Sequence, residues 1–176
     1  MTVPAELAQR IAANPGLVIE QAAAQFEVSA RDVVAALPAS MRRFAPASAF
    51  EEVMADIAGW GEVTVIVHTE DGIFEMTTNV PRGEIGHGYF NLMSSSGLHG
   101  HLRHDRCGGL GFLERPFMGK PSAAILFFNI DGGIMFKVFV GRDETRALRV
   151  DQLEAFRALA DRLAGPVEVG GVNPHP

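Results

Sequence analysis

Residues 63–76 read VTVIVHTEDGIFEM, and this stretch decides the fold class. Valine stands at every second position from residue 63 to residue 67, the period expected of a strand with one buried face. Asp71-Gly72 is a turn pair typical of two-residue β-hairpins. Counting back from that turn pairs His68 with Glu75, a carboxylate that would fix the imidazole tautomer. The stretch therefore predicts an antiparallel hairpin with His68 opposite an acid.

Downstream of this hairpin, a second pair of strand patterns flanks a turn sequence. Residues 122–130 and 134–140 are two apolar runs separated by Asp131-Gly132-Gly133, which predicts a second hairpin. The middle region, residues 82–119, mixes short strand patterns with many glycines. We therefore expect a large antiparallel sheet in this part of the chain.

Helices are expected on both sides of the sheet region. One is predicted from Ser48 to about Gly59, with Ser48 and Glu51 as a capping box. Another is predicted from Asp151 to Ala164, capped by Asp151 and Glu154. Helices, then an antiparallel sheet, then a covering helix make an α+β fold.

The N-terminal segment predicts three short helices, over residues 4–13, 17–26 and 30–37, with Ser29 as the N-cap of the third. The lengths and spacing of these helices resemble a helix-turn-helix, so a DNA-binding regulator is one alternative. However, residues 1–45 contain four arginines and four acidic residues, so this segment has no excess of positive charge. The third helix has only Arg31, next to Asp32. We therefore interpret residues 1–45 as a structural cap, residues 46–165 as the sheet domain and residues 166–176 as a disordered tail.

Composition narrows the class of protein. The chain has 176 residues, of which 47% are hydrophobic and 20% charged, and a net charge of −6, which argues against nucleic acid as the main partner. We recognise no signal peptide and no stretch long enough to span a membrane. The single cysteine, Cys107, cannot form an internal disulfide, so we expect a cytoplasmic protein.

Residues 83–104, GEIGHGYFNLMSSSGLHGHLRH, carry four of the six histidines and the only tyrosine. If this segment is extended, His87 and Tyr89 point to the same face. Imidazole and phenolate are ligands of transition metals and of heme iron. Alternatively, Tyr89 packs its ring in the core and bonds its hydroxyl to a backbone carbonyl.

Other candidate groups are less specific. His99 and His101 would share one face of a strand, a spacing found in metal sites and also on ordinary sheet edges. His104, beside Asp105 and Arg106, has the setting of a surface residue. We find no activated thiolate at Cys107, no phosphate-binding glycine pattern and no nucleophile elbow, so we do not expect an enzyme.

The motifs VIVHTEDGIFEM, GHGYFNL, LHGHL and FKVFVGRDETRAL, in that order, resemble the HutX/ChuX family of intracellular heme-utilization carriers. The resemblance covers nearly the whole chain. It implies a large antiparallel sheet flanked by helices, similar to one half of the two-repeat HemS/ChuS heme proteins, and a homodimer that mimics the two halves. It also implies that heme is held and passed to a heme-degrading partner.

Carried over by position, Tyr89, His68 and His101 match the family residues tied to heme binding, and the resemblance leaves open which one ligates iron. Plausible apolar walls are Phe90, Leu92, Met93, Phe127 and Phe136, and cations for the propionates are Arg103, Arg106, Arg115, Lys120 and Lys137. The candidate heme-binding residues are therefore Tyr89, His68, His101, His99, His87, Lys137 and Arg103. A heme-degrading enzyme is the second hypothesis, a DNA-binding regulator the third and a non-heme metal protein the fourth.

Overall fold

The computed structural model describes residues 4–94 and 97–164. The predicted tail, residues 166–176, lies outside this range. In chain order the elements are α1 (Ala5–Ala13), α2 (Ile19–Gln25), α3 (Ala30–Ala36), η1 (Ala39–Met41), β1 (Arg42–Ala45), η2 (Ala47–Ala49), α4 (Phe50–Ile57), β2 (Glu62–His68), β3 (Ile73–Asn79), β4 (Gly83–Gly86), β5 (Tyr89–Leu92), β6 (Gly100–Leu102), η3 (His104–Arg106), β7 (Cys107–Phe117), β8 (Lys120–Asn129), β9 (Ile134–Phe139) and α5 (Val150–Leu163). The α+β prediction is confirmed.

The centre of the molecule is an antiparallel sheet whose strands lie in the order β1-β7-β8-β9-β2-β3. Both predicted hairpins form, β2–β3 and β8–β9. The predicted pairing of His68 with Glu75 is wrong, because His68 pairs with Ile73 and Glu75 pairs with Ile66. Asp71-Gly72 is the end of a four-residue loop in which the Thr69 amide donates to the Gly72 carbonyl, so the register lies two residues from that of a two-residue turn.

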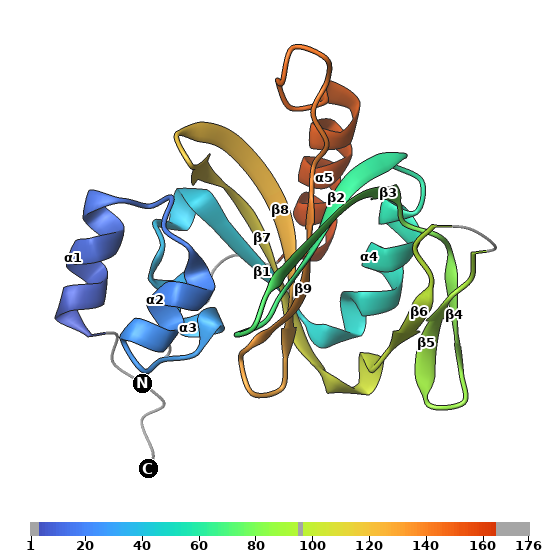
Figure 1. Ribbon diagram of the computed structural model, residues 1–176, viewed down its shortest axis with the longest axis horizontal. Coiled ribbons are helices and arrows are strands. Elements are labelled where there is room, and N and C mark those ends of the chain that lie inside the picture. The colour runs from blue at the N-terminus through green and yellow to red at the C-terminus, as the bar shows by residue number, and fades with distance from the viewer. Residues whose placement is uncertain (1–3, 95–96, 165–176) are drawn as a thin grey trace.

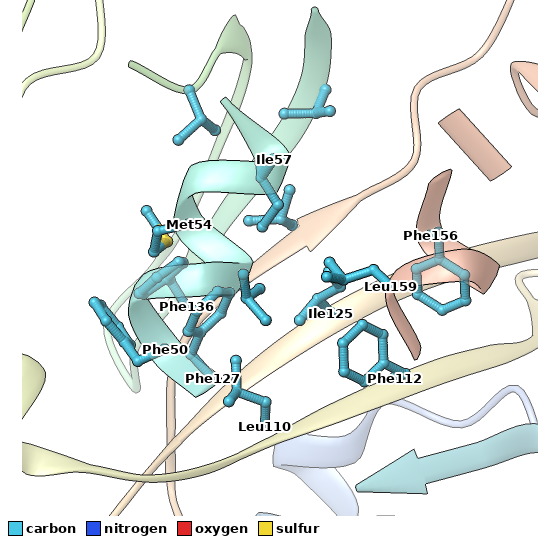
Figure 2. Close-up of a cluster of buried hydrophobic side chains, with 14 of the residues drawn as sticks. Phe50, Met54, Ile57, Leu110, Phe112, Ile125, Phe127, Phe136, Phe156 and Leu159 are labelled. Atoms are coloured by element: carbon cyan, nitrogen blue, oxygen red, sulfur yellow. The ribbon is translucent and has the colours of Figure 1, made fainter. Parts of the chain in front are cut away.

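One face of this sheet packs against α4 and α5. Figure 2 shows Phe50 of α4 beside Phe127 of β8, while Phe156 and Leu159 of α5 lie near Phe112 and Ile125 farther along the same cluster. The Phe127 ring stacks on the Phe136 ring with centroids 4.2 Å apart, and both side chains are buried. These two phenylalanines belong to the core, so their predicted role as ligand walls is wrong.

The opposite face of the sheet packs against α1–α3, which lie at one end of the molecule in Figure 1. Ser29 caps α3 as predicted and forms a capping box with Asp32. The buried Arg115 of β7 donates to the Pro15 and Leu17 carbonyls, which ties the α1–α2 connection to the sheet. Burial lowers the pKa of Arg115 to about 10, so the guanidinium is still charged at neutral pH.

A small sheet, in the order β4-β5-β6, lies at the end of the molecule opposite to α1–α3 (Figure 1). Its strand β5 alternates between buried and exposed residues. Phe90 is 3% exposed and packs edge-on against Phe50 of α4, with centroids 5.3 Å apart. Gly83 is required next to it, since a Cβ there would lie 2.2 Å from the Phe90 ring.

Several boundaries and caps differ from the predictions. Residues Arg42–Ala45, placed in the helical segment by sequence, form β1 and pair with β7. Helix α4 begins at Phe50 after a 3₁₀ turn, without a side-chain cap, so the Ser48 capping box is wrong. Helix α5 begins at Val150, also without a side-chain cap, because the Asp151 carboxylate accepts from Arg149 instead.

Candidate functional site

Tyr89 stands on the outer face of the small sheet. Because Phe90 points into the core, the alternation of β5 directs Tyr89 and Asn91 to the opposite side. Tyr89 is 39% exposed, so the alternative in which its ring packs in the core is wrong. The phenol is therefore accessible to a ligand.

His101 of β6 stands beside Tyr89. Asn91 and His101 are direct partners across β5 and β6, so both side chains share the outer face with Tyr89. The Tyr89 and His101 rings meet edge to face with centroids 5.8 Å apart. His101 Nδ1 lies 2.6 Å from Asn91 Oδ1. The structure thus brings together a phenol, an imidazole and an amide on one exposed surface.

Arg103 follows β6 and supplies positive charge near this surface. Its guanidinium donates twice to the Asp105 carboxylate, over 2.8 and 2.6 Å. The hydrogen bond from Arg103 lowers the pKa of Asp105 to about 2, and the same pair raises the pKa of Arg103. Both groups are fully charged at neutral pH.

The other histidines of the segment do not join this group as predicted. His87 and Gly88 form the two-residue turn between β4 and β5, with φ of 53° and 82°. This positive-φ pair fits a type I′ hairpin, so His87 and Tyr89 do not share the face of one extended strand. His99 precedes β6 and its Nδ1 lies 3.1 Å from the Gly97 carbonyl, so the predicted strand pair with His101 is also wrong.

His104 is not a plain surface residue. It lies in η3, half-buried, with its ring 6.4 Å from the Phe50 ring. Its Nδ1 atom is buried and has no hydrogen-bond partner among the residues that the structure describes. It packs behind the small sheet rather than beside Tyr89 on the outer face.

His68 belongs to a different region. It ends β2 on the face that packs against α2, where its Nδ1 lies 3.4 Å from the Glu20 carboxylate. The same Glu20 oxygen accepts a 2.5 Å hydrogen bond from Lys137 of β9. The side chains of His68, Glu20 and Lys137 are 15%, 20% and 11% exposed, respectively. These three residues, called the Glu20 cluster below, join the helical cap to the sheet.

A groove of about 920 Å³ runs beside His68, between α2–α3 and the loops at the ends of β2 and β8. Its lining includes the acidic residues Glu20, Glu70 and Asp131. Two of these carboxylates are already paired, Glu20 with Lys137 and Asp131 with Arg106.

Most predicted propionate partners are already engaged. Lys137 is paired with Glu20, Arg106 with Asp131, and Arg115 with two backbone carbonyls. Lys120 lies at the exposed start of β8. Arg103 is also paired, with Asp105, and it follows β6 two positions after His101.

Three further observations concern metal ligation, thiol chemistry and membrane crossing. Within residues 4–94 and 97–164, no group of three or more His, Cys, Asp or Glu side chains could hold a metal ion. Burial raises the pKa of the Cys107 thiol, which keeps it protonated and unreactive at neutral pH. In the same described ranges, no helix is long and apolar enough to cross a membrane.

Comparison with known proteins identifies the family. Residues 43–159 match the family described as "Haem utilisation ChuX/HutX". The chain belongs to the ChuX/HutX family. A curated relative, the intracellular heme transport protein HutX of Vibrio cholerae serotype O1, is 35% identical over 155 residues, which cover 88% of this chain and 80% of the relative. The resemblance inferred from the sequence motifs is thereby confirmed.

Solved structures of similar proteins share the fold. A protein from Erwinia carotovora is 44% identical, with a TM-score of 0.85 over 93% of this chain and 99% of its own. The structure titled heme-binding protein ChuX is 37% identical, with a TM-score of 0.80 over 89% of this chain and 97% of its own. The Vibrio cholerae relative is named as a transport protein and ChuX as a heme-binding protein, in agreement with the prediction that the chain is not an enzyme.

The heme-degrading enzyme ChuS of Escherichia coli O157:H7 shares the fold at greater distance. It is 16% identical, with a TM-score of 0.73 over 96% of this chain and 49% of its own length. At this identity the likeness shows the fold alone. It confirms that a ChuX/HutX chain has the fold of about half of ChuS.

Sequence reasoning missed two residues of these sites. Asn91 carries a usable signal, because it stands two positions after Tyr89 in a strand and so shares its face. Glu20 carries none, because its contacts to His68 and Lys137 cross 48 and 117 positions of the chain. Only folding brings that carboxylate to the sheet.

Proposed function

We propose that this chain binds heme and carries it inside the cell to a protein that degrades heme or removes its iron. The observation that carries the proposal is the pairing of Tyr89 and His101 on an open face beside Arg103. Membership of the ChuX/HutX family supports it, as do the names of the relatives from Vibrio cholerae and of ChuX.

The chemistry of this face fits ferric heme. Phenolate and imidazole are both axial donors to heme iron, and a guanidinium is a good partner for a propionate. Because Tyr89 and His101 stand side by side on one face, they approach a flat ligand from the same side, and one of them takes the axial position. We assign that position to Tyr89, with His101 next to the iron and Arg103 toward a propionate.

His68, His87, His99 and Lys137 are not assigned to the iron or its propionates. His68 and Lys137 both contact the Oε1 atom of Glu20, where α2 meets the large sheet, and His87 lies in a turn. The role of the Glu20 cluster is to hold the helical cap on the sheet. The same packing accounts for α1–α3 better than DNA binding does, because Arg31 of α3 donates to the Gly108 carbonyl and its guanidinium lies 5.8 Å from the Phe44 ring centre.

The open position of Tyr89 also supports the proposal of a homodimer. A porphyrin bound on this face would leave its second side in water, and a second copy of the chain would cover it. One chain has the fold of about half of ChuS, so two copies would supply a comparable amount of structure. A cytoplasmic location follows from the proposed cargo, which is handed to intracellular partners.

The proposal is tested by titrating the purified protein with hemin and recording the absorption spectrum. We expect saturation at one heme per chain with sharp bands that differ from those of aggregated hemin. Only the broad spectrum of aggregated heme, at every ratio, would refute heme binding.

A second titration separates a carrier from a heme-degrading enzyme. The heme complex is mixed with a reductant in air, and the heme bands and released iron are followed. A carrier keeps its heme bands and passes heme to apo-myoglobin, an accessible acceptor. Loss of the bands with release of iron would replace the carrier by an enzyme.

A further inference from the structure

We infer that Asn91 is a positioning residue that holds His101 in the tautomer whose Nε2 atom is free to donate a lone pair. The inference concerns the site of the proposed function and rests on it for the identity of the ligand. The state of the imidazole itself is a property of the free protein. It can therefore be tested without heme.

The orientation of the Asn91 amide follows from its surroundings. One end of the amide faces three backbone carbonyl oxygens, those of Gly86 at 3.0 Å, Glu84 at 3.2 Å and Tyr89 at 3.3 Å. A carbonyl oxygen only accepts hydrogen bonds, so the group that faces these three oxygens must be the NH₂ donor. The amide oxygen of Asn91 is thereby turned toward His101.

The tautomer of His101 follows in turn. Its Nδ1 atom lies 2.6 Å from Asn91 Oδ1, which can only accept. The proton of a neutral His101 ring must therefore reside on Nδ1, and Nε2 carries the lone pair. The three carbonyls of the β4–β5 hairpin thus decide, through one side chain, which nitrogen of His101 can bind a metal or accept a proton.

Strand register makes this arrangement specific. Asn91 pairs with Glu84 on one side and with His101 on the other, so it is the central residue of the small sheet on this face. The residue before it, Phe90, is buried against Phe50 and fixes the side to which Asn91 points. Only a side chain with a donor at one end and an acceptor at the other satisfies both the carbonyls and Nδ1.

The consequence for ligand binding is preorganisation. A histidine without a partner at Nδ1 divides its population between two tautomers, only one of which has a free Nε2. Partners that fix the tautomer of a metal-binding histidine are typically worth about 10–100-fold in affinity. In this tautomer the Nε2 atom of His101 can accept the Tyr89 hydroxyl proton without a change of tautomer when Tyr89 becomes a phenolate.

The test is long-range ¹H–¹⁵N NMR of the full chain without heme, at about pH 8.5, well above the unperturbed histidine pKa of ~6.5. A His101→Gln variant assigns the His101 signals. We expect the wild-type protein to show the Nδ1–H tautomer at His101. A predominantly Nε2–H tautomer would overturn the inference without any further variant.

Two substitutions of Asn91 separate the acceptor from the donor. Asn91→Asp keeps an acceptor oxygen for Nδ1–H, and we expect the Nδ1–H tautomer to persist. Asn91→Leu removes both groups, and we expect a mixture that contains the Nε2–H tautomer. Asn79→Leu, at an exposed position of β3, is the matched control and should leave His101 unchanged. A wild-type tautomer ratio in Asn91→Leu would overturn the inference.

Hemin titration of the same proteins adds the functional readout. We expect Asn91→Leu to bind hemin about 10-fold or more weakly than wild type, and Asn91→Asp to lie between them. Wild-type affinity in Asn91→Leu would overturn the positioning role. If the wild-type protein itself did not bind hemin, the proposed function would fail while the tautomer result stood, so the two failures are distinguishable.

Discussion

His68 and His101 both lie on β-strands, and each has a side-chain oxygen near Nδ1, at 3.4 Å for His68 and 2.6 Å for His101, yet their environments differ. His68 shares Glu20 with Lys137 in the contact between α2 and the large sheet. His101 shares Asn91 with the carbonyls of a hairpin on an exposed face beside Tyr89. The comparison teaches that the surroundings of a histidine, more than its place in a motif, decide whether it is available to a ligand.

The two regions are also expected to contribute to different properties, one to stability and the other to heme binding. In the Glu20 cluster a partly buried carboxylate meets a lysine and a histidine, so loss of one partner leaves a charge without compensation. Around Tyr89 the side chains are accessible and contribute little to packing. We therefore expect substitutions in the first region to change stability and substitutions in the second to change heme binding.

The largest effect is expected from Tyr89→Phe. This change keeps the ring and removes only the hydroxyl, so it should weaken hemin binding by more than the ~10–100-fold typical of an outer partner, and alter the ferric spectrum. The free energy of unfolding should change by no more than about 0.5 kcal/mol, because the side chain is exposed. An unchanged spectrum would move the axial position to His101.

Next in size is Glu20→Gln. It leaves Lys137 charged and poorly paired, and we expect it to lower the free energy of unfolding in urea by about 3 kcal/mol, with hemin binding unchanged. Glu52→Gln, which breaks the exposed contact with Arg162, is the matched control and should cost at most about 1 kcal/mol.

The double variant Glu20→Leu with Lys137→Met checks the reason for that loss. Replacing both charges by apolar groups should restore most of the stability, since the cost comes from an unpaired charge. Equal losses in Glu20→Gln and in the exposed control would show that the Glu20 cluster does not anchor the cap.

A smaller effect is expected from His68→Ala. Hemin affinity should stay within about threefold of wild type, which corresponds to well under 1.4 kcal/mol. Stability should fall by about 1 kcal/mol through loss of the contact with Glu20. A loss of hemin affinity as large as that of Tyr89→Phe would contradict the separation of the two regions and would mean that a second copy brings His68 to Tyr89.

The smallest effect concerns the pair of Arg103 and Asp105. Because the pKa of Asp105 is lowered to about 2 in the folded protein, the pair contributes to stability above about pH 4 and loses that contribution as the pH falls toward 2. Asp105→Asn should lack this part of the acid dependence in thermal melts. It should also free Arg103 and strengthen hemin binding about twofold or threefold, whereas weaker binding would show that Arg103 acts only through Asp105.

The alternation of residues 63–67 and the apolar runs around residues 131–133 were sufficient to predict the hairpins and the α+β class, because burial of one strand face leaves a period of two. The register of β2 with β3 was not predictable from Asp71-Gly72, since a four-residue loop can use the same pair. The helix starts at Phe50 and Val150 were also missed: α4 follows a 3₁₀ turn, and near Val150 the Asp151 carboxylate accepts from Arg149.

The sequence by itself determined most of the strands and helices, the family and the candidate iron ligands, above all a single tyrosine within a histidine-rich segment. Those properties are local, and strand alternation and residue chemistry are written into neighbouring positions. Tertiary structure alone decided that His101 joins Tyr89 while His68 joins Glu20 and Lys137, because strand pairing and helix packing unite residues that lie far apart in the chain. Tertiary structure also decided which ring nitrogen of His101 carries no proton, because this depends on three carbonyls that only the folded hairpin aligns.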